Sequence, residues 1–236
     1  MRSAAVVIIG DEILKGKFAD ENTPFLVRQL RALGVDLVRV VVVPDVVDEI
    51  AEEVRRCSDK AELVFTTGGV GPTHDDRTLE AIAAAFEVPL VSCPELVELL
   101  GRKVATMNDA ARRMTELPEG YELLWDEGIW FPLVKVRNVH VFPGVPSFLK
   151  LKFEAACWRW RGEPVVARTL TTEQTELQIA ARLTEAQARF PAVEIGSYPR
   201  FEGPHHVIVT LEGRDPDAVE ACEAWLAERL ELRDEG

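Results

Sequence analysis

Cysteine is scarce in this sequence, with 4 residues in 236, and none of them forms a Cys-x-x-Cys pair. That spacing argues against a zinc cluster and against a disulfide framework. Cys57 and Cys222 occupy apolar positions of expected helices, so we expect both to be buried thiols.

Basic residues are also in deficit. The chain has 27 Lys and Arg against 40 Asp and Glu, a formal net charge of −13 at pH 7, and no basic run offsets it. Duplex nucleic acid and anionic membranes are therefore disfavoured as partners. A small phosphorylated ligand is not excluded, because backbone N–H groups or a metal ion can hold it locally.

Long hydrophobic runs are missing as well. The apolar run near the start, 4–9, is too short for a signal core or a membrane span, and we expect a cytoplasmic protein. The hydrophobic fraction of 47% is ordinary for a folded chain with a substantial core.

Strand and helix patterns alternate through the first half of the chain. This alternation predicts an α/β fold with a mainly parallel sheet and helices on both faces. The expected strands are 4–9, 37–43, 63–66, 134–136 and 139–142. Helices are expected from an N-cap at Thr23 to Gly34, around 50–57 and 79–86, over 94–114, and from Pro146 to Trp160, while 117–132 looks irregular.

Composition shifts near 161–164, which predicts two domains, 1–162 and 163–236. The second has the order β-α-β-β-α, a small α+β unit. Its strands are expected at 165–170, 193–197 and 207–211, with a capping box at Thr171 and Gln174 and a cap at Asp215 for the last helix.

The segment from Thr66 to Asp76 follows a strand and precedes a helix, where open α/β folds bind ligands. Its glycines let the backbone approach an anion closely, and its hydroxyls add donors. The expected phosphate-binding residues are Thr67, Gly68, Gly69, Gly71, Pro72 and Thr73.

Two carboxylates, Asp75 and Asp76, close this loop. Beside a phosphate they would repel the ligand, and a divalent cation that bridges carboxylate and phosphate oxygens removes the conflict. The alternative is structural: Asp76 caps the next helix and Asp75 is solvated.

Acidic residues also follow the first two strands. Gly10, Asp11 and Glu12 come after the first and Asp45 after the second, where a polar turn and a helix cap are the structural alternatives. If the strands are neighbours, the carboxylates converge on one crevice. Gly144 and Pro146, in a turn between a strand and a helix, line the pocket or simply form a tight turn.

The segments 10–14, 67–78 and 143–146 resemble the molybdopterin-binding (MoaB/Mog-like) domain family. Asp20, Asn22 and the Gly196–Pro199 motif extend the resemblance over nearly the whole chain. The turn at 143–146 and the tail from Val165 are similar to the branch that contains the competence/damage-inducible protein CinA and part of certain FAD synthases.

The resemblance implies metal-dependent hydrolysis of a nucleotide pyrophosphate such as ADP-ribose or FAD. The resemblance implies catalytic roles for Asp75, Asp76 and Asp45. It implies that Mg²⁺, Co²⁺ or Mn²⁺ would be held by Asp75, Asp76 and Asp11. The ligand would be a nucleotide or a pterin. The alternatives are a molybdopterin adenylyltransferase and a non-catalytic binding module. We also expect a homo-oligomer, a dimer or a trimer, and no amidase domain, since the chain ends at Gly236. The segment 121–131 is closer to the FAD-synthase type.

Overall fold

The computed structural model describes residues 2–104, 106–200 and 206–233. Its chain divides into two compact units, Met1–Gly162 and Glu163–Gly236. Each unit has a hydrophobic core of its own. Among the described residues, no helix combines the length and apolar character that crossing a membrane requires.

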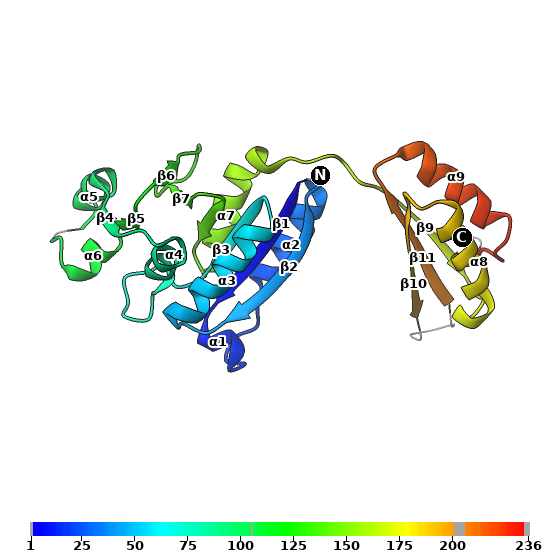
Figure 1. Cartoon of the computed structure of the whole chain (residues 1–236), viewed down its shortest axis with the longest axis horizontal. Helices are drawn as coiled ribbons and strands as arrows, with labels where there is room; N and C mark the ends of the chain where they lie inside the picture. The colour runs from blue at the N-terminus through cyan, green and yellow to red at the C-terminus, as the bar shows by residue number, and fades with distance from the viewer. Residues whose placement is uncertain (1, 105, 201–205, 234–236) are drawn as a thin grey trace. The chain divides into compact units, whose positions relative to one another are not determined.

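The first unit is built on a six-stranded sheet of order β2-β1-β3-β8-β7-β6. The first four strands are parallel, β7 pairs antiparallel with β8, and β6 at the edge pairs antiparallel with β7 (Figure 1). The expected mainly parallel sheet is therefore confirmed. The strands are β1 (Ser3–Ile9), β2 (Asp36–Val43), β3 (Leu63–Thr67), β6 (Tyr121–Leu124), β7 (Leu133–Val136) and β8 (Val139–Phe142).

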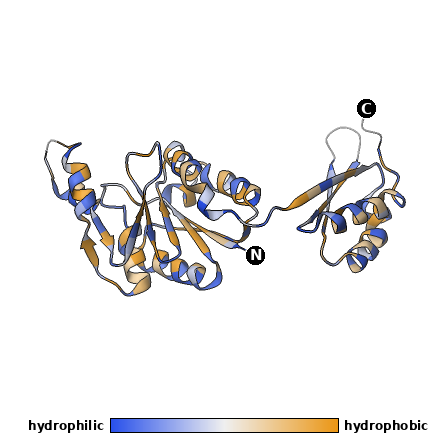
Figure 2. Cartoon of the chain, turned by 90° about the horizontal axis from the view of Figure 1, so that it is seen from above, coloured by the Kyte–Doolittle hydropathy of each residue, from blue (hydrophilic) through white to orange (hydrophobic). Residues whose placement is uncertain are grey.

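Helices cover both faces of this sheet because its central strands are apolar on both sides. One hydrophobic cluster joins the sheet to α2 and α7, and a second joins it to α3, α4 and α5. The covering helices show hydrophobic and hydrophilic residues side by side in Figure 2. The helices are α1 (Asp11–Leu14), α2 (Asn22–Ala32), α3 (Val47–Lys60), α4 (Thr78–Phe86), α5 (Pro94–Gly101), α6 (Asp109–Arg113) and α7 (Pro146–Ala156), followed by the 3₁₀ turn η1 (Cys157–Trp160).

The carboxyl ends of four strands lie in register at one edge of the sheet. Thr67 pairs with both Ile8 and Phe142, and Ile8 pairs with Val42 on its other side. The loops after β1, β2, β3 and β8 therefore leave the sheet along one line. Ligands bind at this edge in open α/β sheets.

The middle of the chain differs from expectation. The segment 94–114 is not one helix, because α5 ends at Gly101 and α6 starts after Asn108, whose side chain accepts a hydrogen bond from Ala111 N at 2.9 Å. Part of 117–132 is regular, since β4 (Leu90–Ser92) pairs with β5 (Glu116–Pro118) and β6 pairs with β7. These pairings join segments far apart in sequence, which local patterns do not reveal.

The expected N-cap at Thr23 is wrong. The N-cap of α2 is Glu21, two residues earlier, and Asp20 Oδ1 accepts hydrogen bonds from the amides of Asn22 and Thr23 at 2.9 and 3.0 Å. An Asp two residues before the helix satisfies its free N–H groups as well as a residue at the cap itself would.

The second unit is a three-stranded antiparallel sheet with two helices. Asp215 caps the last helix, as expected, by accepting from Asp217 N and Ala218 N. The expected capping box is misplaced, because it forms at Thr175 and Gln178 while Thr171 lies in a strand. The elements are β9 (Val166–Thr172), α8 (Glu176–Arg189), β10 (Glu194–Arg200), β11 (His206–Gly213) and α9 (Pro216–Ala227), with sheet order β10-β11-β9.

A buried histidine makes the first unit sensitive to acid. His140 is only 3% exposed, stacks on Phe65 with ring centroids 5.3 Å apart, and accepts a hydrogen bond from Trp160 Nε1 at 3.1 Å. Burial lowers the pKa of His140 to about 4, because the apolar surroundings disfavour its charged form.

We expect the free energy of unfolding to fall by about 3 kcal/mol as pH decreases from about 6.5 to about 4, since the unfolded chain binds this proton first. The variant His140→Gln keeps a hydrogen-bond acceptor and does not titrate, so it should lack this part of the loss. Urea unfolding of both proteins across that pH range measures the difference. Parallel pH profiles would show that His140 does not set the acid sensitivity.

Candidate ligand and metal site

The loop after β3 has a backbone that only glycine permits. Gly68 and Gly69 have φ angles of +102° and +61°. A Cβ atom on Gly68 would lie 2.0 Å from the carbonyl oxygen of Ile9, and one on Gly69 would lie 2.5 Å from Thr78 Oγ1. The two glycines therefore allow the end of β3 to pack closely against the end of β1. They also leave this part of the loop backbone without side chains.

Thr78, at the start of α4, fixes this loop. Its hydroxyl donates to Gly68 O at 2.7 Å and its amide donates to Gly69 O at 3.0 Å. Thr78 is fully buried, so both carbonyls are held inside the fold and turned away from a ligand.

The carboxylate of Asp76 shapes the loop and does not cap α4. It accepts hydrogen bonds from the amide of Thr73 at 2.8 Å and from the Thr73 hydroxyl. The cap position belongs to Arg77, and no side chain caps this end of α4. Gly71 packs against the same carboxylate, with a Cβ position 2.7 Å from Asp76 Oδ2. On the other side of the loop, the carbonyl of Pro72 accepts from Arg113 Nη2 at 2.8 Å.

The acidic residues after the three neighbouring strands interact with one another. Asp45 Oδ2 accepts a hydrogen bond from Asp11 N at 2.9 Å, and the helix-cap alternative for Asp45 is wrong because α3 is capped at Val46 without a side-chain bond. Partial burial, followed by the negative charges of Glu12, Asp11 and Asp75, raises the pKa of the Asp45 carboxyl. The loops after β1, β2 and β3 thus bring carboxylates into one electrostatic environment.

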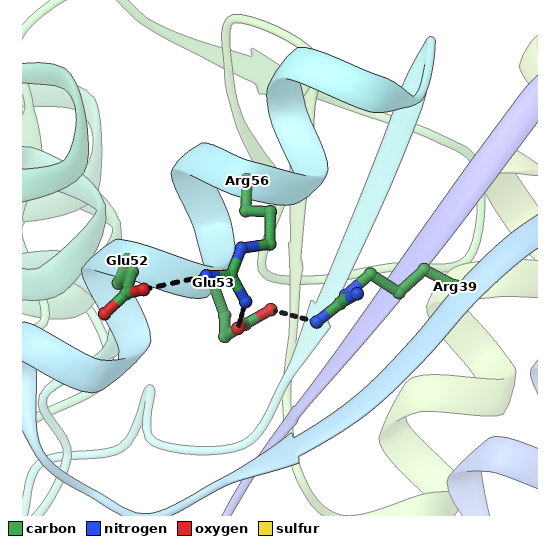
Figure 3. A network of polar contacts seen from close by, with 4 residues as sticks. All are labelled: Arg39, Glu52, Glu53 and Arg56. Carbon is green, nitrogen blue, oxygen red and sulfur yellow. Dashed lines mark hydrogen bonds and ion pairs between the residues drawn. The ribbon is translucent and has the colours of Figure 1, made fainter.

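An ion-pair network holds the β2–α3 connection that carries Asp45. Arg39 of β2 contacts Glu53 of α3 at 2.9 Å, and Arg56 contacts Glu53 and Glu52 at 2.6 and 2.9 Å (Figure 3). Single surface ion pairs contribute little. The half-buried Glu53 joins two arginines from different elements, so the network orients α3 on the edge strand.

Two carboxylates of the site have lowered pKa values and are therefore ionised at neutral pH. A hydrogen bond from the side chain of Lys15 lowers the pKa of Asp11 most, and the nearby Thr73 side chain lowers the pKa of Asp75 most, although the Thr73 hydroxyl donates its proton to Asp76. The Thr73 hydroxyl thus lies close to both Asp75 and Asp76. His74 points its Nδ1 toward Asp75 at 3.9 Å, but its side chain is almost fully exposed.

The turn after β8 completes the site. A Cβ atom on Gly144 would lie 3.1 Å from Gly68 Cα, so the two backbones pass in direct contact. Pro146 starts α7, where its missing N–H is not needed. On the β1 side, the amide of Gly10 donates to Val43 O at 3.1 Å. The Glu12 carboxylate packs against the Cα of the same glycine.

The residues proposed from sequence lie in loops at one edge of the sheet. No group of three or more His, Cys, Asp or Glu side chains within the described ranges is close enough together to hold a metal ion. The negative charges of Glu12, Asp11 and Asp75 add to the effect of burial on the Asp45 pKa, and a divalent cation would neutralise them.

Four residues of the site had no assigned role in the sequence analysis: Lys15, Asn22, Thr78 and Arg113. Asn22 and Thr78 stand inside motifs that carry the family resemblance, but their bonds join segments that only the fold brings together. Arg113 comes from the segment 94–114, and no sequence signal connects it to Pro72.

The fold and this edge define an α/β domain with a candidate ligand site at the carboxyl ends of its strands. The chain belongs to the probable molybdopterin-binding domain family, whose model matches residues 5–161. The model for the middle domain of FAD synthase matches residues 164–234. Both matches confirm the resemblance found in the sequence.

Known proteins support the same assignment. A protein of Archaeoglobus fulgidus is 36% identical over 225 residues, covering 95% of this chain and 96% of its own. A probable FAD synthase of Caenorhabditis briggsae is 34% identical over 97% of this chain, which spans 50% of that enzyme. The crystal structure of CinA from Thermoplasma acidophilum, a protein described as of unknown function, superimposes with a TM-score of 0.63 at 27% identity, covering 67% of this chain and 98% of its own.

The raised pKa of Asp45 leads to a stability prediction. Asp45→Asn keeps an oxygen that accepts from Asp11 N and removes a charge that the folded state disfavours. We expect the melting temperature of the metal-free protein to rise by about 1–2 °C at pH 7, corresponding to about 0.5 kcal/mol after screening by solvent. The gain should disappear as pH falls through the raised pKa, because the wild-type carboxyl is then neutral. Calorimetric scans with EDTA at pH 7 and pH 4 test it, and equal melting temperatures at pH 7 would contradict it.

Proposed function

We propose that this chain hydrolyses a nucleotide pyrophosphate, such as ADP-ribose or FAD, with the help of Mg²⁺, Co²⁺ or Mn²⁺. The observation that supports the proposal most is that acidic residues after three neighbouring strands act on Asp45 beside a glycine loop. Asp11 N donates to Asp45 Oδ2 at 2.9 Å, and the charges of Glu12, Asp11 and Asp75 add to the burial that raises the Asp45 pKa. Carboxylates that repel one another at an anion-binding loop are stabilised by a divalent cation.

The residues divide the work between them. The backbone N–H groups between Gly69 and Gly71 would hold phosphate oxygens. The hydroxyls of Thr67 and Thr73 shape the loop, because they donate to Pro143 O and to Asp76. Asp75, Asp45 and Asp11 would hold the cation, together with the oxygen of Asp76 that accepts no hydrogen bond from Thr73. When bound, the cation would lower the pKa of a water and neutralise charge on the pyrophosphate. The carboxylates would keep the positive charge of the cation beside the pyrophosphate before and during the reaction.

The test is to incubate the purified protein with ADP-ribose or FAD and each of the three metal ions, and to measure AMP by chromatography. We expect AMP release with at least one metal and none with EDTA. No AMP from correctly folded protein with any of the metals would reject hydrolysis. Tight binding of unchanged ligand would instead favour a non-catalytic binding module.

A second candidate is adenylylation of molybdopterin from ATP, favoured by the description of the family whose model matches residues 5–161. It would use the same loop. The match of 164–234 to the middle domain of FAD synthase ranks this candidate lower. Formation of adenylylated molybdopterin in a reconstituted assay, with no AMP release from ADP-ribose or FAD, would reverse the order.

A homo-oligomer, a dimer or a trimer, is part of the proposal. Its support is the outer face of α7 and η1, where Phe148, Leu151 and Trp158 are 56%, 47% and 56% exposed. Large apolar side chains gathered on one helix face are unusual on a monomer surface. Light scattering should give two or three times the chain mass, and a mass of 26.3 kDa would reject it.

A further inference from the structure

The side chain of Asn22 links three segments of the site and keeps one polar atom unused. Asn22 is only 7% exposed. Its Nδ2 donates to Thr67 Oγ1 at 3.0 Å and to the carbonyl of Gly144 at 2.8 Å. Its Oδ1 is buried and accepts no hydrogen bond from any described residue.

The orientation of this amide follows from its partners. The single proton of the Thr67 hydroxyl goes to the carbonyl of Pro143 at 3.0 Å, so Thr67 Oγ1 can only accept from Asn22. Gly144 O is a carbonyl and likewise accepts only. Turning the amide over would place an oxygen against two acceptors, and this fixes Oδ1 as the free atom.

A buried acceptor without a donor destabilises the folded state. Phosphate oxygens are acceptors at neutral pH and do not satisfy it, so a ligand group that bonds to Asn22 Oδ1 has to be a donor. Thr67 directly precedes Gly68, and Gly144 touches Gly68 Cα, which puts Asn22 next to the phosphate-binding loop. In a nucleotide, the group nearest the phosphate that donates a hydrogen bond is a ribose hydroxyl.

We propose that Asn22 is a specificity-determining residue whose Oδ1 accepts a hydrogen bond from a ribose hydroxyl of the ligand, so that the site selects ribonucleotides over deoxyribonucleotides. This inference deepens the proposed function and rests on it. The glycine loop would bind the phosphates of the ligand, which are hydrogen-bond acceptors. Asn22 would bind a hydroxyl, which is a hydrogen-bond donor. Both N–H groups of Asn22 are used inside the protein, so the residue has no free donor for a phosphate.

The test measures binding of AMP, 2′-deoxy-AMP and 3′-deoxy-AMP by calorimetry in the presence of Mg²⁺, since AMP has no pyrophosphate to hydrolyse. For the wild type, we expect one deoxy analogue to bind about 10-fold more weakly than AMP, as expected for one hydrogen bond. Asn22→Ala should bind AMP more weakly and bind all three with equal affinity. Thr23→Val is the matched control, because Thr23 Oγ1 is a neighbouring buried polar atom without a partner, and it should keep the discrimination.

Several results would overturn the inference. Equal binding of the three ligands by the wild type would do so, whatever the variants show, and so would failure of the wild type to bind AMP. Discrimination that persists in folded Asn22→Ala would assign it to another residue. If Asn22→Ala does not fold, the wild-type comparison decides the question. Ribose discrimination without AMP release from ADP-ribose would reject hydrolysis and leave the role of Asn22 in place.

Discussion

Replacing Asp75 with asparagine is expected to lower metal-dependent AMP release about 100-fold or more. The carboxylate of Asp75 is exposed, is ionised because Thr73 lowers its pKa, and contributes to the raised pKa of Asp45 across the site. An amide of the same shape removes the charge that faces the cation, and such groups contribute several kcal/mol to a metal-assisted reaction. Initial rates with ADP-ribose or FAD, measured over a range of metal concentrations, give the size of the loss.

Asp59→Asn serves as the control for this substitution, since Asp59 lies in the last turn of α3, away from the edge that carries the site. It should retain the wild-type rate. If Asp75→Asn keeps full activity at low metal concentration, Asp75 does not act on the metal and its place in the site is wrong.

Gly68→Ala is expected to destabilise the first unit by about 4 kcal/mol or more, a loss of roughly 10 °C in melting temperature. The new Cβ atom would lie 2.0 Å from the carbonyl oxygen of Ile9, and the φ of +102° is unfavourable for alanine. The ends of β1 and β3 must separate, which also disrupts the loop proposed to hold phosphate. Thermal unfolding and AMP binding measure the two effects.

Gly120→Ala is a matched control for backbone strain. Gly120 has a φ of +83°, and no atom lies within 4 Å of its Cβ position. Its substitution tests the left-handed backbone alone and should cost about 1–2 kcal/mol. Similar losses in the two variants would show that the contact between Gly68 and Ile9 is not tight.

Local patterns in the sequence were sufficient for the elements of the parallel sheet. The apolar runs of β1 and β3 are buried on both faces, and such runs favour central strands. The order of acidic residues after successive strands also predicted a shared edge, because parallel neighbours end on the same side. The hydrogen bond between Asp11 and Asp45 is the contact that follows from that order.

Local sequence patterns could not predict the pairing of distant strands or the hydrogen-bond partners of polar side chains. β5 and β6 are short, and they exist because β4 and β7 lie beside them. The capping box was misplaced by four residues because Thr171 and Gln174 have the same spacing as Thr175 and Gln178, and only the extent of β9 separates the two choices. The role of Asn22 depends on its hydrogen bonds to Thr67 and Gly144, which are 45 and 122 residues away in the sequence.

The central claim is that carboxylates from the ends of separate strands share one cation with a phosphate held by the glycine loop. Electron paramagnetic resonance of free Mn²⁺ tests it most directly, with the protein alone and with added ADP-ribose. We predict weak binding of Mn²⁺ to the protein alone, at least 10-fold tighter binding with the nucleotide, and loss of this coupling in Asp45→Asn and Asp75→Asn. Mn²⁺ binding that is unchanged by the nucleotide, or by either substitution, would contradict the account.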